Sequence, residues 1–320
     1  MKIAVTGASG FLGSWICRVA GRLHEIHALT SPNSDLTRLK NIENLQIHKG
    51  DLQGWLNCLE TIKPEALVMA DWWGVGNLLR NDLRQYDNLN RVKLISAKAI
   101  EMGAKVVIGL GSQAEVGPTN LQISDSIVEK PTTHYGRAKI EARNIIDSLS
   151  ENSDSRSVWL RILSTYGPLD HGTWLIPQTV DSLQKGKEML LTKGEQEWSY
   201  LHAYDLATSV LLAVEKHTLN GIATVGNPQT VTLRDLIMSI GEIMGRKELL
   251  CFGAIPYRND QVMKLIPDVS KLMQAGWSPR VNLDSGLSQT IDWIQGHQLE
   301  YVELNDGTRF MTNVPLRKET

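Results

Sequence analysis

The sequence is poor in cysteine: its 320 residues include three, Cys17, Cys58 and Cys251, which lie far apart. No CxxC pair or Cys/His pair accompanies them, so neither a disulfide framework nor a zinc site is expected. A few unpaired thiols are typical of the reducing cytoplasm. We therefore expect a cytoplasmic protein without a bound metal.

Long apolar runs and an excess of charge of one sign are also missing. No stretch of about 18 apolar residues occurs, and the N-terminal MKIAVTGASG reaches glycine too early for a secretion signal. The formal net charge is -2, from 33 basic and 35 acidic residues, which provides no basic surface for nucleic acid. We expect neither a membrane nor a nucleic acid as a partner.

Phenylalanine is scarce as well, with 3 Phe against 9 Trp. Tryptophan fills a core or stacks on a nucleobase, and core packing is the more common role of any single one. Trp72 and Trp73 follow the apolar run EALVMA, at the end of a strand where open α/β sheets bind ligands. We expect one of them to line a pocket and the other to pack in the core.

The first half of the chain alternates short apolar runs with longer amphipathic ones. The short runs are KIAVT, EIHALT, NLQIH, EALVMA and KVVIGL, and a helix from about 134 to 149 and a strand SVWLRIL continue the series. Strands that alternate with helices predict a parallel sheet with crossover helices, and nearly all-apolar strands predict burial on both faces. Beyond residue 170 the pattern loosens into shorter elements, and the polar end, about 301–320, predicts a loose hairpin or tail.

A glycine loop, TGASGFLGS at 6–14, places Gly7, Gly10 and Gly13 between the first strand and the first helix. Glycines there permit a tight turn and a close approach of the backbone to a pyrophosphate, and the helix N-terminus favours negative charge. The strand-turn-helix context predicts a dinucleotide site rather than a purely structural turn. The spacing is GxxGxxG, not GxGxxG.

The stretch HYGRAKIEAR places Tyr135 and Lys139 four residues apart, on one face of the predicted helix. Such pairs recur by chance on amphipathic helices, so the pair alone indicates no function. Together with the glycine loop, GDL at 50–52, GSQAEVG at 111–117, LRILSTYGP at 160–168 and WSYLHAYDLA at 198–207, however, it resembles the extended short-chain dehydrogenase/reductase superfamily. The resemblance covers nearly the whole chain and lies with the branch of nucleotide-sugar epimerases, dehydratases and reductases.

The resemblance implies a fold, a substrate class and an assembly. It implies a Rossmann-type doubly wound parallel sheet that binds NAD(P) at 1–170, completed by segments near 198–226. It also implies a smaller C-terminal α/β lobe at 171–320, mainly for substrate binding. The substrate would be a small-molecule nucleotide sugar, and the protein would be a homodimer paired through two helices, one of which carries Tyr135.

The resemblance also implies roles for individual residues. The catalytic positions are Ser112, Tyr135 and Lys139. The cofactor positions are Gly7, Ser9, Gly10, Phe11, Leu12, Gly13, Ser31, Arg38, Asp51, Leu52, Ala70, Tyr135 and Lys139, with Asp51 at the adenine. The substrate positions are Trp72, Asn88, Trp174, Trp198 and Arg258, where Asn88 would order the backbone or a water and Arg258 would bind the diphosphate. The chain departs from the family by having Trp198 where relatives often have an Arg, and Val116 where they have a Tyr.

The resemblance implies that the three catalytic positions form a proton-transfer unit. A phenol with a reference pKa of about 10 is a poor base near neutrality, so we expect Lys139 to lower the pKa of Tyr135. In the reducing direction Tyr135 would be the acid. Ser112 would hydrogen-bond the reacting oxygen while hydride moves between the sugar carbon and the nicotinamide.

The sequence narrows the reaction within the branch. The 4,6-dehydratases of the family carry Asp-Glu directly after the catalytic Thr, whereas Gln113 and Ala114 follow Ser112 here. Glu115 comes one position later and, if this segment is extended, would point to the opposite face. Elimination of water is therefore not expected, and an epimerase or a ketoreductase is.

The end of the second strand bears on the cofactor. NAD sites usually place an acidic residue there, but this strand ends in Thr30 and Ser31, with Arg38 nearby. A hydroxyl and a cation favour NADP over NAD, and NADP commonly serves net reductions. We therefore expect reduction of a 4-keto-6-deoxy nucleoside-diphosphate sugar. An NAD-dependent nucleotide-sugar epimerase is the alternative, and a catalytically silent nucleotide-binding protein is a third hypothesis.

Overall fold

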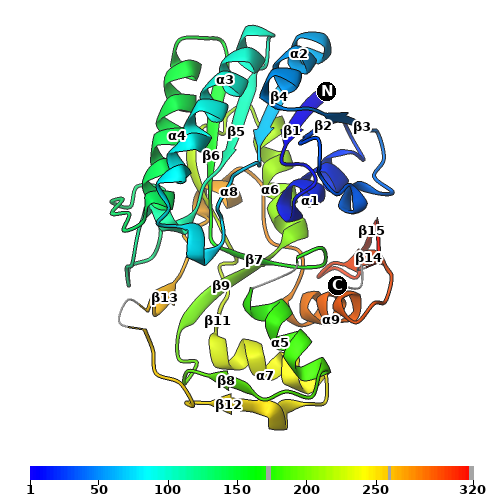
Figure 1. Ribbon diagram of the computed structural model, residues 1–320, viewed down its shortest axis with the longest axis vertical. Coiled ribbons are helices and arrows are strands. Elements are labelled where there is room, and N and C mark those ends of the chain that lie inside the picture. The colour runs from blue at the N-terminus through cyan, green and yellow to red at the C-terminus, as the bar shows by residue number, and fades with distance from the viewer. Residues whose placement is uncertain (171–173, 259–260, 317–320) are drawn as a thin grey trace.

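The computed structural model of this chain describes residues 1–170, 174–258 and 261–316. Its main feature is a seven-stranded sheet in the order β10-β6-β5-β4-β1-β2-β3, in which every pair is parallel (Figure 1). The strands are β1 (Lys2–Thr6), β2 (Glu25–Thr30), β3 (Leu45–Lys49), β4 (Ala66–Met69), β5 (Val106–Leu110), β6 (Arg156–Ile162) and β10 (Gly221–Val225). The order from β3 to β6 is that of a Rossmann sheet, which confirms the predicted fold class.

Helices cover both faces of this sheet. They include α1 (Phe11–Ala20), α2 (Leu52–Ile62), α3 (Asp87–Glu101), α4 (His134–Glu151) and α6 (Ala203–Glu215). Alternate residues of β1 enter different cores: Ile3 and Val5 pack with α1 and α6, whereas Ala4 packs with α2, α3 and α4. A strand that is apolar at every position is therefore buried on both faces, as a doubly wound sheet requires.

A second lobe lies below the carboxyl ends of these strands (Figure 1). Its sheet contains β7 (Ser164–Tyr166), β9 (Glu197–His202), β11 (Thr230–Thr232) and β13 (Lys264–Leu265), and β8 (Met189–Leu191) pairs with β12 (Leu250–Phe252). The helices of this lobe are α5 (Leu175–Gln184), α7 (Leu233–Ile243) and α9 (Leu283–Ile294), while α8 (Ser270–Gln274) packs near β10. Of the segment near 198–226 that we expected to complete the main sheet, only β10 joins it. The cause is that β9 forms its hydrogen bonds with β7, β11 and β13 instead.

The C-terminal segment is a hairpin, but it is not loose. Strands β14 (Leu299–Glu303) and β15 (Arg309–Val314) pair antiparallel, and Val302 and Val314 are fully buried. The Arg18 guanidinium of α1 donates to the Thr312 carbonyl over 2.7 Å. These contacts pack the hairpin onto the Rossmann domain. Its composition is polar, but apolar residues along its strands face the core.

Short 3-10 helices complete the described chain: η1 (Thr37–Leu39), η2 (Asn77–Leu79), η3 (Leu83–Tyr86), η4 (Gln113–Glu115) and η5 (Lys247–Leu249). Three of them, η2, η3 and η4, lie in loops that follow β4 and β5 at the carboxyl edge of the main sheet. None of the helices within the described ranges has the length and apolar content that crossing a bilayer demands.

Candidate active site

The glycine loop lies between β1 and α1 and leaves no room for side chains. Gly7 has a φ of +62, and a Cβ there would lie 2.6 Å from the Asp71 nitrogen. A Cβ on Gly13 would lie 2.2 Å from the Gly7 oxygen. Gly10 is the N-cap of α1, which has no side-chain cap and no acidic residue in its first turn. The exposed backbone and the positive helix end fit a dinucleotide pyrophosphate held by residues 7–13.

Other predicted cofactor residues lie at the same carboxyl edge of the sheet. Asp51 follows β3 and caps α2, where its carboxylate accepts from the Gly54 N–H over 2.9 Å. Leu52 begins that helix. Ala70 follows β4, and its N–H donates to the Thr6 hydroxyl over 3.2 Å. The Asp51 carboxylate is thus partly engaged as a helix cap, and the adenine contact expected of it stays a prediction.

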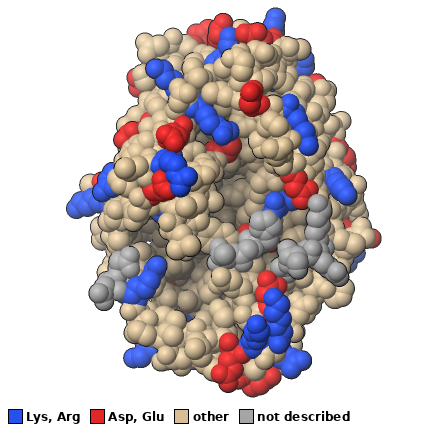
Figure 2. All heavy atoms as spheres, viewed as in Figure 1, with Lys and Arg blue, Asp and Glu red and all other residues tan. Residues whose placement is uncertain are grey.

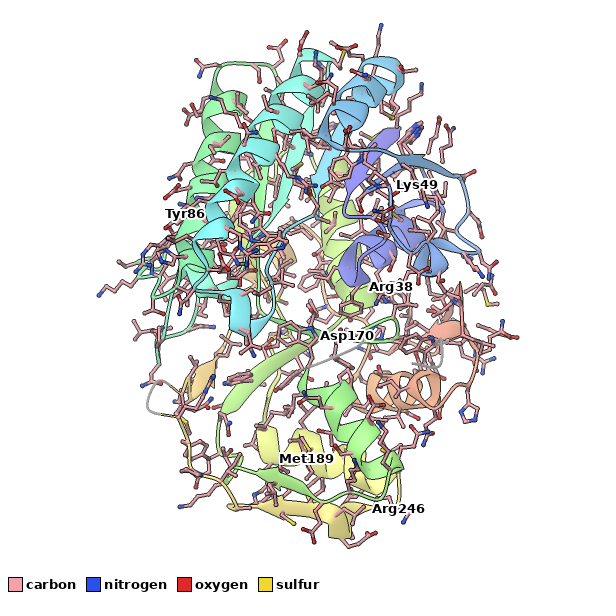
Figure 3. The ribbon with its side chains drawn as sticks, viewed as in Figure 1. Arg38, Lys49, Tyr86, Asp170, Met189 and Arg246 are labelled. Carbon is pink, nitrogen blue, oxygen red and sulfur yellow. The ribbon has the colours of Figure 1, made fainter. Side chains whose placement is uncertain are left out.

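Arg38 and Ser31 follow the end of β2. Ser31 is exposed, and its hydroxyl lies 2.8 Å from that of Ser34. The Arg38 guanidinium donates through Nε to the Leu169 carbonyl (3.0 Å) and through Nη1 to the Ser9 carbonyl (3.4 Å). Burial lowers the pKa of Arg38, and the nearby Asp170 opposes this effect. Figure 3 shows Arg38 and Asp170 at the junction of the two lobes, so Arg38 connects the glycine loop with the segment after β7.

The structure brings Ser112, Tyr135 and Lys139 together. Ser112 follows β5, and Tyr135 and Lys139 lie one turn apart at the start of α4; all three are buried. The Ser112 hydroxyl hydrogen-bonds the Tyr135 phenol. The Lys139 ammonium donates to the Leu110 carbonyl over 2.7 Å. Two adjacent features, the end of β5 and the first turns of α4, therefore hold the expected catalytic set.

Glu115 is a residue of this site whose role the sequence did not reveal. We expected it to point away on an extended segment, but η4 is a 3-10 turn that folds it back onto Ser112. Its carboxylate accepts from the Ser112 N–H (2.7 Å), the Trp159 indole (3.0 Å) and the Arg161 guanidinium (3.1 Å), and it is fully buried. Arg161 was the available signal, because a cation within the apolar run VWLRIL needs a buried counter-charge.

The loop between β4 and α3 lies against the catalytic pair. The Lys139 Nζ lies 3.8 Å from the centroid of the Trp72 ring. The Trp72 and Tyr135 rings form a T-shaped contact, with 6.1 Å between their centroids. The Arg80 guanidinium lies 5.3 Å from the centroid of the Tyr135 ring. Trp72, predicted to line the sugar pocket, thus contacts the catalytic side chains themselves. Arg80 was not predicted as a site residue, because it lies in a polar stretch of the sequence without a recognisable motif.

Asn88 orders the backbone of this loop from the first turn of α3. Its side chain accepts from the Trp73 N–H over 2.8 Å and donates to the Gln85 carbonyl over 2.9 Å. It is 5% exposed, so these bonds are shielded from water. The arrangement agrees with the expected ordering role, and Asn88 acts on the site through the loop.

The three remaining substrate candidates lie in the second lobe, and one of them, Trp198, packs on a cluster that includes Val116, the residue after η4. Trp198, on β9, donates its indole N–H to the Val262 carbonyl over 2.9 Å and packs against Leu265. Trp174 is the N-cap residue of α5 and is partly buried. Arg258 is exposed at the end of a described range. Their contacts with a substrate stay predictions.

The pKa values of the catalytic pair differ from our expectation. Burial raises the pKa of Tyr135, while the Ser112 hydrogen bond and the Arg80 charge act against this rise. The pKa of Lys139 is lowered to about 7 by burial, against the charges of Glu115 and Asp71. The phenol therefore keeps its proton at neutral pH, so Tyr135 is prepared to act as an acid.

These residues can carry out proton transfer to an oxygen on a carbon that gains hydride. A bound dinucleotide would supply or accept that hydride at its nicotinamide ring. Tyr135 would donate its proton to the oxygen as negative charge develops there, and Ser112 would hydrogen-bond the same oxygen and fix its direction. Lys139, as an ammonium, would stabilise the tyrosinate that remains. The reverse sequence would return the proton to Tyr135.

A hollow on the surface accompanies this site. Figure 2 shows it near the middle of the viewed face, where the two lobes meet. In Figure 1 the same level of the molecule holds the carboxyl ends of the parallel strands. Open α/β sheets bind ligands outside these strand ends, so the hollow has the position expected of a binding cleft.

Comparison with known proteins gives concordant matches. The model of the NAD dependent epimerase/dehydratase family matches residues 3–226. The chain is 31% identical to putative GDP-L-fucose synthase 2 of Arabidopsis thaliana over 91% of each chain. It is 23% identical to dTDP-4-dehydro-6-deoxyglucose reductase of Escherichia coli, over 61% of this chain and 63% of the relative. The structure of the UDP-glucose 4-epimerase of Thermus thermophilus in complex with NAD has a TM-score of 0.81 at 20% identity, covering 92% of this chain and 99% of that one.

Proposed function

We propose that this chain, which belongs to the NAD dependent epimerase/dehydratase family of the extended short-chain dehydrogenase/reductase type, is a reductase. Its substrate is a 4-keto-6-deoxy nucleoside-diphosphate sugar and its reductant is NADPH. The observation that carries the proposal is the buried Tyr135, which holds its proton beside Ser112 and Lys139. Such a phenol is suited to protonate the oxygen of a carbonyl that is being reduced.

The carboxylates around the site support a reductase over a dehydratase. Elimination of water needs a free acid or base at the sugar, but Gln113 and Ala114 follow Ser112. Glu115 is ion-paired with Arg161 over 3.1 Å, and Asp71 with Arg91 over 2.5 Å. Glu115 is thus enclosed by its partners and one Asp71 oxygen is paired with Arg91, so neither stands in for the missing Asp-Glu pair.

The end of β2 supports NADPH. Ser31 stands where a carboxylate would grip the ribose hydroxyls of NAD, and the Arg38 guanidinium lies beside the glycine loop through its bond to the Ser9 carbonyl. A planar guanidinium offers the paired donors that a 2′-phosphate accepts. The relative named dTDP-4-dehydro-6-deoxyglucose reductase also favours net reduction.

One observation favours an NAD-dependent nucleotide-sugar epimerase as the second candidate. Arg38 already donates to two backbone carbonyls, those of Leu169 and Ser9, which leaves it fewer donors for a phosphate. An epimerase would use Ser112, Tyr135 and Lys139 in the same way, but would oxidise and re-reduce the sugar on a retained dinucleotide. The two functions differ in net redox change.

We also propose where the substrate binds, how the protein assembles and where it is located. We place the nucleotide sugar against the lobe at 171–320, with Trp174, Trp198 and Arg258 as candidate contacts. A homodimer through two helices that include α4, and a cytoplasmic location, are expectations that follow from the family resemblance and from the cysteine usage.

The test begins with the dinucleotide. The freshly purified protein is denatured, any released dinucleotide is identified by mass, and the emptied protein is titrated with NADPH and NADH. An empty site that prefers NADPH is the expected result. Retained NAD together with a preference for NADH would contradict the reductase and support the epimerase. Tight dinucleotide binding without turnover of any sugar nucleotide would instead favour a silent binding protein.

A further inference from the structure

Trp72 is in direct contact with the catalytic ammonium. The Lys139 Nζ lies 3.8 Å from the centroid of the indole, within the range of a close cation–π contact. Nζ also donates to the Leu110 carbonyl over 2.7 Å and lies 5.8 Å from the centroid of the Tyr135 ring. The face of an indole carries negative potential, so this contact favours the charged form of the amine.

The acids near Lys139 are engaged elsewhere. Asp71, at the end of β4, is paired with Arg91 of α3 over 2.5 Å, and Glu115 of η4 is paired with Arg161 of β6 over 3.1 Å. Their charges still favour the ammonium at a distance, although each acid is paired with an arginine. No ion pair joins Lys139 to a carboxylate within the described ranges. Beside the Leu110 carbonyl, the Trp72 indole is thus a close partner of the ammonium.

A hydrogen bond to the buried Gln85 fixes the orientation of the Trp72 indole. Its Nε1 donates to the Gln85 Oε1 over 2.8 Å. Gln85 is fully buried, and its amide donates to the carbonyls of Gly74 (2.7 Å) and Leu79 (3.0 Å). The ring edge-on to Tyr135 completes the contact. The hydrogen bond to Gln85 and the ring contact with Tyr135 together fix the position of the indole beside Lys139.

We propose that Trp72 is a positioning residue, which keeps Lys139 charged and places its ammonium beside Tyr135. This inference rests on the proposed function, in which Lys139 must be an ammonium. Because burial lowers the pKa of Lys139 to about 7, a modest stabilisation of the charged form decides its state at neutral pH. As pH rises through that pKa the ammonium is lost, so loss of the indole narrows the alkaline side of the activity profile.

The test measures the Lys139 pKa directly, in protein freed of dinucleotide. Lysine is labelled with carbon-13 at Cε, the Lys139 signal is assigned by its loss in Lys139→Arg, and it is followed by NMR as pH is raised. Trp72→Leu should lower the pKa by about half a unit to one unit, since it removes the π face, whereas Trp72→Phe should shift it by less. An unchanged pKa in Trp72→Leu would overturn the inference. If Trp72→Leu does not fold, Trp72→Met is judged by the same criterion.

The neighbouring tryptophan provides a matched control. Trp73, which we expected to pack in the core, is instead 38% exposed, and its ring centroid lies 4.5 Å from the Arg84 guanidinium. Trp73→Leu and Trp73→Phe should leave the Lys139 titration as in the wild type. An equal shift in Trp73→Leu would mean that the loop acts as a whole and would contradict a specific role of Trp72.

Turnover separates this inference from the proposed function. If sugar nucleotides are reduced, the alkaline limb of the kcat profile should move to lower pH in Trp72→Leu by the same amount as the NMR pKa. A shifted pKa without turnover of any sugar nucleotide would leave the Trp72–Lys139 interaction standing and contradict the reductase. Normal turnover of a sugar nucleotide together with an unshifted Lys139 pKa would support the reductase and contradict the role of Trp72.

Discussion

The carboxyl edge of the main sheet and the second lobe differ in how they hold their candidate residues. At the sheet edge, Ser112, Tyr135 and Lys139 meet in one buried cluster with hydrogen bonds between their elements. In the second lobe, Trp198 is bonded to its own lobe and Arg258 is exposed. The proposed reaction chemistry is therefore tied to the sheet topology, whereas the proposed substrate contacts depend on a lobe in which Trp198 serves packing and Arg258 lies at the surface.

The largest effect should come from the phenol. Tyr135→Phe removes the proton donor, so kcat should fall by about 10²- to 10⁴-fold while dinucleotide affinity is retained. The measurement is steady-state turnover beside a dinucleotide titration. Turnover near the wild-type rate would place the proton transfer elsewhere and break the contrast between the two regions.

A smaller but still large effect concerns stability at the sheet edge. Glu115→Gln removes the fully buried member of the two carboxylates paired with Arg161, the other being Glu129, so the free energy of unfolding should fall by about 3 kcal/mol, measured in urea. Glu43→Gln, in an exposed pair with Arg22, is the control and should cost less than about 1 kcal/mol. Equal losses in the two variants would mean that the Glu115 network adds no more than a surface pair.

Cofactor choice is the next test of the sheet edge. Arg38→Gln removes the cation beside the glycine loop, so affinity for NADPH should fall by about tenfold or more while affinity for NADH changes little. Arg38→Lys, which keeps the charge, should retain part of the preference. A parallel loss for both dinucleotides would assign Arg38 to loop structure, through its bonds to Leu169 and Ser9.

The smallest effect is expected in the second lobe. Trp198→Phe removes the hydrogen bond to the Val262 carbonyl, so the free energy of unfolding should fall by about 1 kcal/mol with kcat unchanged. Thermal unfolding and turnover are measured together, with the sugar-nucleotide KM as an additional readout. A fall in kcat as large as that of Tyr135→Phe would place Trp198 at the reacting centre and remove the difference between the regions.

Much of the fold and of the catalytic set could be predicted because their signals are local. Apolar runs set the strands, the glycine spacing sets the turn before α1, and the four-residue spacing sets Tyr135 and Lys139 on one face of α4. The structure adds what depends on contacts between distant segments. The fold-back of Glu115 requires the 3-10 turn η4 and a cation on β6, and the approach of Trp72 to Lys139 requires the path of the loop after β4. The placement of β9 in the second sheet is of the same kind, since its partners come from three other segments.

The most direct test of the central claim is the redox stoichiometry of turnover. The emptied protein is mixed with NADPH and with 4-keto-6-deoxy sugars carrying each common nucleoside diphosphate, and nicotinamide absorbance and sugar products are followed together, with Tyr135→Phe as control. We predict that one of these sugars is reduced with the oxidation of an equal amount of NADPH, and that Tyr135→Phe slows both changes by about 10²- to 10⁴-fold. Interconversion of nucleotide sugars without net oxidation, on protein that retains NAD, would contradict it.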